Sequence, residues 1–262
     1  MIISIITPNR NGAEYIEKTL SSILDQQGCK IELIVVDGAS SDNSMDVIRR
    51  FENRLAFCIS EPDKGMYDAI NKGMRLARGD ILAYLNSDDF YYPGTLEFVA
   101  KYFQDNPVVD LVYGDLNFVD SNNRVIFKQN YPSFNKSRFR SMHYSMIGQP
   151  GSFWRRSLWE KVGEFDTSLK MASDFDFYIR AGESGRIAHV QKTLAAFRVH
   201  DKSMTQRQAE VSGAEVEELH RRYLKNQSRI QNFYSRTIGN INFKLINVVN
   251  IHKRISSLIN KR

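Results

Sequence analysis

The first 115 residues alternate between short apolar runs and segments whose apolar residues recur with helical spacing. The apolar runs are residues 2–7, 31–37, 56–60, 81–85 and 111–113, and the helical segments are residues 14–27, 43–53, 66–77 and 94–103. Continuous runs of this length that are rich in β-branched residues are typical of strands covered on both faces. Their alternation with helical segments predicts an α/β fold, with a mostly parallel central sheet and flanking helices.

After residue 115 the pattern changes. The alternation of residues 116–131 around residues 121–123 predicts a hairpin, and residues 132–144 are expected to form a loop. Further strands are expected at 151–154, 187–190 and 194–200, and further helices from 155 and at 174–183. From residue 209 onward the pattern is helical. We therefore expect one domain over residues 1–208, made of the halves 1–115 and 116–208, and a helical extension over residues 209–262.

Polar residues follow directly after four of the predicted strands. They are Thr7, Pro8, Asn9 and Asn11 after the first strand, Asp37 after the second, Asp63 and Lys64 after the third, and Asn86, Ser87 and Asp88 after the fourth. In open α/β sheets, ligands bind beyond the carboxyl ends of the strands. The four segments therefore predict one binding cleft, although each of them alone is also compatible with an ordinary turn or helix cap.

Two adjacent carboxylates, Asp88 and Asp89, stand at the end of the fourth predicted strand. Because like charges repel in a buried place, such a pair requires a cation nearby. Mg²⁺ typically combines one or two carboxylates with the phosphates of a substrate. The sequence has neither the glycine-rich dinucleotide fingerprint nor the phosphate-binding loop of nucleoside triphosphatases, which argues against both classes. A metal ion that neutralises a diphosphate fits these residues.

Four segments together resemble family 2 glycosyltransferases. They are residues 4–11 (SIITPNRN), 34–42 (IVVDGASSD), 61–73 (EPDKGMYDAINKG) and 79–89 (GDILAYLNSDD). A fifth segment, residues 171–180 (MASDFDFYIR), is similar to the acidic motif of the same enzymes. The resemblance covers residues 1–205 and extends to bacterial enzymes that build capsular, exopolysaccharide or colanic-acid units. It implies the GT-A fold and a transfer that inverts the anomeric carbon of the sugar.

The resemblance also implies roles for individual residues. Nucleotide-sugar binding falls to Thr7, Pro8, Asn9, Asn11, Asp37, Asp63, Lys64, Asn71, Asn86, Ser87 and Asp88. Asp88 matches the metal-binding carboxylate of the Asp-x-Asp motif, and His200 matches a histidine that contacts the metal or the diphosphate. A divalent cation, Mg²⁺ or Mn²⁺, is therefore the expected cofactor. Asn86 departs from the motif, because an amide stands where the family has its first acid, and lower metal affinity is expected.

Asp174 takes the position of the family's catalytic base, at the start of a predicted helix. Inverting transfer needs a carboxylate that deprotonates the acceptor hydroxyl. The resemblance further implies acceptor contacts for Gln149, Trp154, Asp176 and Arg180. From the residues alone, a carboxylate at a helix start is also an ordinary cap, and a tryptophan is also an ordinary core residue.

The charge of the chain is divided unevenly. The net charge is +6, but residues 219–262 contain ten Lys or Arg and no Asp or Glu, which leaves a net charge of −4 on the rest. Within residues 230–262 an apolar helical stripe lies beside the cations, a pattern typical of helices that bind anionic membrane surfaces. A helix that packs on the domain or on a second copy in a homodimer is the alternative. No nucleic-acid partner is expected, because no recognised binding module is present.

These observations predict an inverting glycosyltransferase that takes its sugar from a UDP- or GDP-sugar. The expected acceptor is a glycan, linked to a lipid carrier such as undecaprenyl diphosphate. We expect a cytoplasmic protein at the inner face of the membrane, since Met1–Ile6 lack the features of a secretion signal and Cys29 and Cys58 are interpreted as buried free thiols. Two alternatives stay open: a sugar nucleotidyltransferase, and a non-catalytic partner with the same fold that docks through its basic helix.

Overall fold

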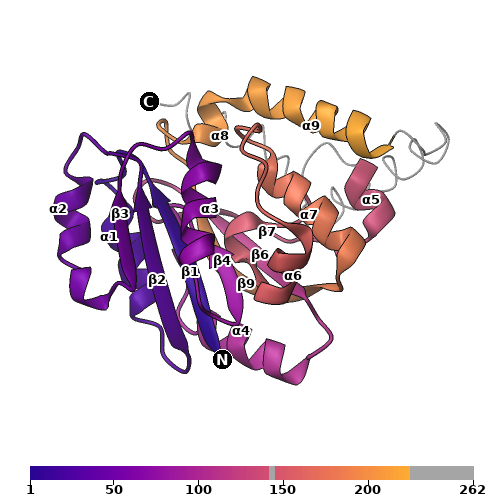
Figure 1. Cartoon of the computed structure of the whole chain (residues 1–262), viewed down its shortest axis with the longest axis horizontal. Coiled ribbons are helices and arrows are strands. Elements are labelled where there is room, and N and C mark those ends of the chain that lie inside the picture. The colour runs from indigo at the N-terminus through magenta and orange to yellow at the C-terminus, as the bar shows by residue number, and fades with distance from the viewer. Residues whose placement is uncertain (142–144, 225–262) are drawn as a thin grey trace.

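The computed structural model describes residues 1–141 and 145–224. Its strands are β1 (Ile2–Asn9), β2 (Lys30–Asp37), β3 (Phe57–Ser60), β4 (Ile81–Tyr84), β5 (Phe90–Tyr91), β6 (Leu111–Val119), β7 (Val125–Gln129), β8 (Ser152–Arg155) and β9 (Ile187–Arg198). In this part of the chain they form a single sheet of order β3-β2-β1-β4-β8-β6-β9-β5, and β7 pairs with β6. The sheet crosses the whole molecule (Figure 1).

Helices connect and cover these strands. They are α1 (Ile16–Leu24), α2 (Ser44–Arg49), α3 (Met66–Leu76), α4 (Thr95–Asp105), α5 (Lys136–Ser141), α6 (Arg156–Val162), α7 (Ser173–Ser184), α8 (Met204–Arg207) and α9 (Ala209–Leu224), with short 3₁₀ turns at Glu52–Arg54 and Gln149–Gly151. Helix α3 packs closely against β1. A Cβ atom at Gly73 would lie only 2.6 Å from the side chain of Ile6, so the absence of a side chain at Gly73 permits this close approach. Figure 1 shows α5, α6, α7 and α9 gathered beside the second half of the sheet.

The predicted α/β fold with flanking helices is confirmed, and the sheet is mixed. Strands β3, β2, β1 and β4 are all parallel, as expected for residues 1–115. In the second half, β8 runs antiparallel to both β4 and β6, β7 runs antiparallel to β6, and only β9 pairs with β6 in parallel. The expectation of a mostly parallel sheet therefore holds for the first half alone, since the hairpin and β8 reverse direction in the second.

Two local predictions for the second half need correction. The expected loop 132–144 contains a helix, α5, whose Phe139 is buried against Phe134 and Phe175. The two expected strands 187–190 and 194–200 are one long strand, β9. The pairing of β9 with β6 shifts register around Gly114 and Asp115, so β9 accommodates its residues between 190 and 195 as a bulge without ending the strand. The predicted hairpin around residues 121–123 is confirmed by the pairing of β6 with β7.

The parallel register brings the carboxyl ends of the first strands together. Asn9 is the register partner of Asp37, which in turn pairs with Ser60, and Ile6 pairs with Tyr84, two residues before Asn86. The polar segments that follow β1, β2, β3 and β4 therefore meet at one edge of the sheet, as the sequence predicts.

Helix α9 belongs to the same hydrophobic core as the sheet. Leu219 is 0% exposed and Val216 is also buried, both within the main core cluster, and α9 contacts α5. The core thus continues past residue 208, while the rest of the expected extension, residues 225–262, lies outside the described residues. Within the described residues, no helix is both long enough and apolar enough to cross a bilayer. The two cysteines are free, but the expected burial is wrong, since Cys29 is only half-buried and Cys58 is exposed.

Removing the side chain of Leu219 should destabilise the whole domain. Leu219→Ala leaves a cavity in the core and should lower the free energy of unfolding by about 2–5 kcal/mol. Val211→Ala on the same helix is the matched control, because Val211 is 37% exposed and its truncation should change the free energy by less than about 0.5 kcal/mol. Urea unfolding followed by circular dichroism measures both. Equal midpoints for the two variants would mean that α9 is not part of the cooperative core.

Candidate active site

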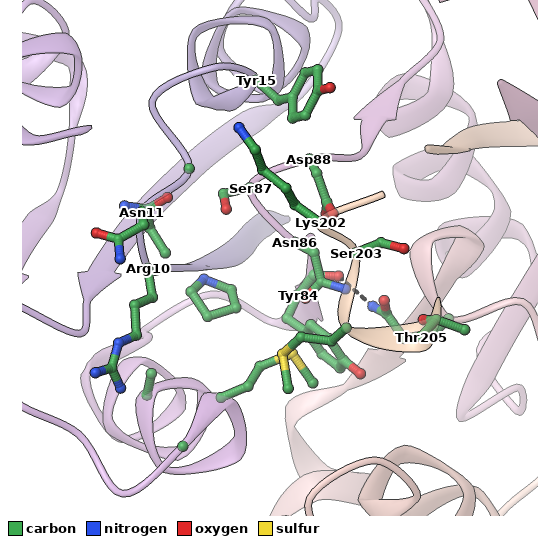
Figure 2. Close-up of a pocket in the computed structure, with 18 of the residues that line it drawn as sticks. Arg10, Asn11, Tyr15, Tyr84, Asn86, Ser87, Asp88, Lys202, Ser203 and Thr205 are labelled. Carbon is green, nitrogen blue, oxygen red and sulfur yellow. Dashed lines mark hydrogen bonds between the residues drawn. The ribbon is translucent and has the colours of Figure 1, made fainter. Parts of the chain in front are cut away.

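A cleft of about 350 Å³ opens at the edge of the sheet where the strand ends meet. Figure 2 shows Asn11 at one side of it, Asn86 and Ser87 in the middle, and Ser203 and Thr205 at the other side. The predicted site residues that line it are Pro8, Asn9, Asn11, Asp63, Asn86, Ser87, Asp88, Gln149, Asp174 and His200. The fold therefore joins residues from both halves of the domain in one place, which sequence spacing alone could not establish.

Asp37 supports the cleft from behind rather than lining it. Its carboxylate is fully buried and accepts hydrogen bonds from Asn9 Nδ2 at 2.7 Å, from Ser60 Oγ at 2.7 Å, and from the backbone N–H and the hydroxyl of Ser40 at 3.0 and 2.5 Å. Burial opposes ionisation of Asp37, but these hydrogen bonds outweigh it and hold its pKa below the usual range. The ionised Asp37 fixes the amide of Asn9, whose Oδ1 is buried at the cleft without a partner.

Asp88 and His200 form a close pair within the cleft. Asp88 Oδ2 lies 3.0 Å from His200 Nε2, and the two side chains are 28% and 11% exposed. The ring of Tyr15 lies 4.7 Å from the histidine ring and supports it from the first half of the chain. At the rim of the cleft, Lys202 forms an ion pair with Glu14 at 3.0 Å, so the segment after β9 is attached to the segment before α1.

Arg198 is the buried cation behind the two adjacent carboxylates. It is 2% exposed; its Nε donates to the carbonyl of Asp88 at 2.7 Å, and its backbone N–H donates to Asp89 Oδ1 at 2.8 Å. Burial, and then the nearby charge of Asp88, raise the pKa of Asp89 well above its usual range. The sequence analysis missed Arg198, although a charged residue at the end of an apolar strand was a visible signal.

The residues present fit a divalent cation that is shared with a substrate. Asp88 offers a carboxylate oxygen and His200 an imidazole nitrogen, and Asn86 Oδ1 is a buried acceptor without a partner beside them. Among the residues that the structure describes, no group of three or more His, Cys, Asp and Glu could hold a metal ion by itself. The arrangement therefore suits a cation whose remaining ligands are phosphate oxygens and water, as is common for Mg²⁺.

Asp174 is a half-buried carboxylate in the same cleft. Burial is the main cause that raises the pKa of Asp174 to about 6, and hydrogen bonds from the Phe175 N–H at 2.8 Å and the Tyr67 hydroxyl at 3.3 Å only partly oppose it. The N-cap of α7 is Ala172, so Asp174 lies inside the first turn and is not the cap that the sequence left open. A carboxylate with a pKa near 6 is well suited to accept a proton at neutral pH.

Three methionines line the cleft together with Asp174. Met66 opens α3, Met171 precedes α7 by two residues, and Met204 opens α8 and is 40% exposed. Gln149 lies nearby and is fixed by its hydrogen bond to the carbonyl of Tyr84 at 2.8 Å. Flexible thioether side chains of this kind adapt to apolar ligands of varied shape.

Several predicted site residues do not line the cleft. They are Thr7, Asp37, Lys64, Asn71, Trp154, Asp176 and Arg180. The buried side-chain amide of Asn71 donates to the carbonyl of Phe165 at 2.9 Å and accepts the N–H of Phe165 at 3.0 Å. Trp154 is buried against Phe177. These two residues therefore stabilise the second half from within.

Asp176 and Arg180 bond to each other at 2.8 Å instead of facing the cleft. Tyr223 of α9 donates to Asp176 at 2.6 Å, and Arg180 also donates to the carbonyl of Glu164. Residues two apart on a helix do not face the same way, so the placement of Asp174 in the cleft directs Asp176 toward α9. The acceptor contacts expected of Trp154, Asp176 and Arg180 are thus replaced by structural roles.

Comparison with known proteins adds a family to this geometry. The model of the family described as glycosyl transferase family 2 matches residues 4–163. A glycosyltransferase of Nostoc sp. is 29% identical over 214 residues, which are 76% of this chain and 65% of that protein. The glycosyltransferase of PGL/p-HBAD biosynthesis from Mycobacterium bovis is 32% identical over 192 residues, 68% of this chain and 69% of that protein. The chain thus spans about two thirds of the length of these relatives.

Solved structures share the fold at low sequence identity. S. aureus TarS 1–349 in complex with UDP-GlcNAc has a TM-score of 0.65 at 19% identity, over 97% of this chain and 78% of that 1–349 chain. The mannosyltransferase PcManGT from Pyrobaculum calidifontis, in complex with GDP-Man and Mn²⁺, has a TM-score of 0.65 at 21% identity, over 93% of this chain and 69% of that protein. The GT-A fold implied by the sequence is therefore confirmed.

The raised pKa of Asp174 should make the protein less stable as the pH rises. Its carboxyl ionises near pH 6 when folded and near pH 4 when unfolded, so between these values the folded state binds the proton more tightly and stability falls with rising pH. Asp174→Asn should therefore raise the free energy of unfolding by about 1–3 kcal/mol at pH 8, and by much less at pH 4.5. Urea unfolding at the two pH values measures this difference.

Asp105→Asn is the matched control, because Asp105 is an exposed residue of α4. It should change the free energy of unfolding by less than about 0.5 kcal/mol at either pH. Equal stability of the wild-type protein and Asp174→Asn at pH 8 would contradict the raised pKa.

Proposed function

The chain belongs to glycosyl transferase family 2, and we propose that it is an inverting enzyme that transfers a sugar from a UDP- or GDP-sugar to a glycan acceptor. One observation carries the proposal. Asp174, with a pKa near 6, lines the same cleft as the Asp88–His200 pair, so a base and a site for the leaving diphosphate stand together. The complexes of TarS with UDP-GlcNAc and of PcManGT with GDP-Man support both nucleotides as candidates.

In the proposed reaction, the acceptor hydroxyl loses its proton to Asp174 as its oxygen bonds to the anomeric carbon. The bond from that carbon to the diphosphate oxygen breaks on the opposite face, so the configuration inverts and a nucleoside diphosphate leaves. Asp88 and His200 would hold Mg²⁺ or Mn²⁺, and the cation supplies positive charge for the diphosphate. Asn9 and Asp63 line the nucleotide end of the cleft, and Asn86 offers its free Oδ1 to a donor hydroxyl.

The two alternatives are less well supported. A sugar nucleotidyltransferase would need a glycine-rich basic loop after β1, and Pro8, Asn9 and Arg10 are a poor substitute for it. It would also release pyrophosphate instead of a nucleoside diphosphate. A non-catalytic partner would not need a carboxylate such as Asp174, held in the cleft with a pKa suited to a base.

An acceptor with an apolar part fits the methionine side of the cleft. Met66, Met171 and Met204 offer apolar and adaptable contacts beside Asp174, which suits a glycan linked to a lipid carrier such as undecaprenyl diphosphate. The basic stripe of residues 230–262, outside the described residues, would bring the enzyme to the inner face of the cytoplasmic membrane, where that acceptor lies. The alternative role of this segment, contact with a second copy, is kept.

Asp174→Asn should abolish transfer while leaving donor binding nearly unchanged. The amide cannot take the acceptor proton, so turnover should fall by at least about 10²-fold, while the donor Kd stays within about threefold because the Asp88–His200 pair is untouched. Release of nucleoside diphosphate and calorimetric donor titration measure the two effects, and Asp105→Asn should behave as wild type. An active Asp174→Asn protein would refute the assignment of the base.

Donor binding should depend on a divalent cation held by Asp88. A panel of UDP- and GDP-sugars, each with and without Mn²⁺ or Mg²⁺, should show one donor that raises Tm, because a ligand at 100 times its Kd stabilises by about 2.7 kcal/mol. Asp88→Ala should remove the metal-dependent part of this rise, and Asn86→Asp should lower the metal concentration needed, since it adds a second carboxylate. Turnover that is unaffected by EDTA would refute the metal site.

A further inference from the structure

The carboxylate of Glu215 binds the backbone directly in front of α7. It accepts the N–H of Lys170 at 2.7 Å, of Met171 at 2.8 Å and of Ala172 at 3.0 Å. Glu215 lies on α9, more than forty residues further along the chain, so this is a long-range contact between two elements. Three backbone donors on one side chain leave little freedom to the segment that they belong to.

This contact satisfies the backbone donors of the segment that leads into α7. The first N–H groups of a helix and of the residues before it have no partner within the helix, and a side-chain cap usually satisfies them. Ala172, the N-cap residue, makes no side-chain cap hydrogen bond. Glu215 accepts the N–H of Ala172 and of the two residues before it, whereas the Phe175 N–H in the first turn donates to Asp174. The negative charge of Glu215 at this end also suits the helix dipole.

The same segment is held on its other side by α3. The Tyr67 hydroxyl lies 3.1 Å from the carbonyl of Met171 and 3.3 Å from Asp174 Oδ1. Asp174 follows Ala172 by two residues, so its position is set between Tyr67 on α3 and Glu215 on α9. Met171, which lines the cleft, is fixed by the same two contacts.

We propose that Glu215 is a positioning residue for the reaction: through its three backbone hydrogen bonds it sets the place of Asp174 and Met171 in the cleft. This inference rests on the proposed role of Asp174 as the base. If Glu215 has this role, α9 affects the reaction although Glu215 does not line the cleft. Helix α9 is followed in the chain by the basic segment 225–262. Whatever holds or displaces α9 then changes the rate of transfer.

Glu215 also acts on Asp174 through its charge. The negative charge of Glu215 is one of the causes that raise the pKa of Asp174, after burial. A variant without this charge should therefore ionise Asp174 at a lower pH. The positional and the electrostatic effects can be separated, because one depends on the reach of the side chain and the other on its charge.

The test compares Glu215→Gln with two controls in the full-length protein. Glutamine has lost one acceptor oxygen and carries an NH₂ group, so it cannot accept all three N–H groups. Glu217→Gln removes the same charge at an exposed position of α9. Arg222→Ala removes the ion pairs of α9 with Asp166, at 3.1 Å, and with Asp176 of α7, at 3.7 Å, without touching the backbone in front of α7. Steady-state kinetics over pH 5–9 and Tm are measured for each.

We expect kcat of Glu215→Gln to fall about 10- to 100-fold, since small displacements of a catalytic group cost about that much. The donor KM should stay within about twofold, and the acidic limb of kcat/KM should move to lower pH. Glu217→Gln and Arg222→Ala should keep kcat within about twofold of wild type, whatever their Tm. If Glu215→Gln does not fold, Glu215→Asp gives the test: it keeps the charge and shortens the reach, so kcat should fall while the acidic limb stays.

Two results would overturn the proposal. One is a Glu215→Gln protein, or a folded Glu215→Asp protein, with wild-type kcat. The other is a loss of kcat in Arg222→Ala as large as that in Glu215→Gln. This result would mean that Glu215 only helps to hold α9 in place and has no specific role in positioning Asp174. Asp174→Asn is assayed alongside: if it remains active, the proposed base is wrong, and if it is inactive while the Glu215 variants are unaffected, only the present inference fails.

Discussion

The burial of Arg198 is the interaction on which the rest of the cleft depends. Its guanidinium donates to the backbone carbonyl of Asp88 and its backbone N–H donates to Asp89 Oδ1, so Arg198 fixes the segment that carries the two adjacent acids. Because Arg198 closes β9, the same contact joins the second half of the domain to the end of β4. It also places His200, two residues later, against Asp88. The proposed site of the leaving group thus depends on how one cation is buried.

The sequence could predict the polar strand ends, because they follow from local patterns and from the geometry of parallel sheets. Asn9, Asn86 and Asp88 reach one cleft because β1 and β4 are neighbours in register. The orientation of α7 could not be predicted in the same way, since it depends on α3, α6 and α9 together. Helical spacing did contain part of the answer: with Asp174 in the cleft, Asp176 had to face elsewhere, and the structure places it against Tyr223.

The position in the chain where acidic residues end is not the position where the hydrophobic core ends. Acidic residues end with Glu218, which is why composition divides the chain there, whereas Leu219 lies in the hydrophobic core. The acidic side of α9 includes Glu215, whose charge is used against the backbone before α7. Composition shows where the charged residues lie in the chain, and only the fold shows which of them form contacts within the domain. The division of the chain at residue 208 stays a prediction. Residues 225–262 lie outside the described residues.

Three buried or half-buried carboxylates at this edge of the sheet differ in how many donors they meet, and their roles follow from that difference. Asp37 accepts four hydrogen bonds, which outweigh burial and lower its pKa, so it is a fixed charge that holds Asn9. The Asp89 carboxylate accepts one hydrogen bond, from the backbone N–H of Arg198, and the pKa of Asp89 is raised well above the usual range. Asp174 accepts two, which leaves its pKa near 6. Each further donor would stabilise the ionised form of Asp174 and make it a weaker base. A carboxylate that takes and returns a proton near neutral pH must be incompletely satisfied, so the stability lost at Asp174 is a condition of the chemistry proposed for it.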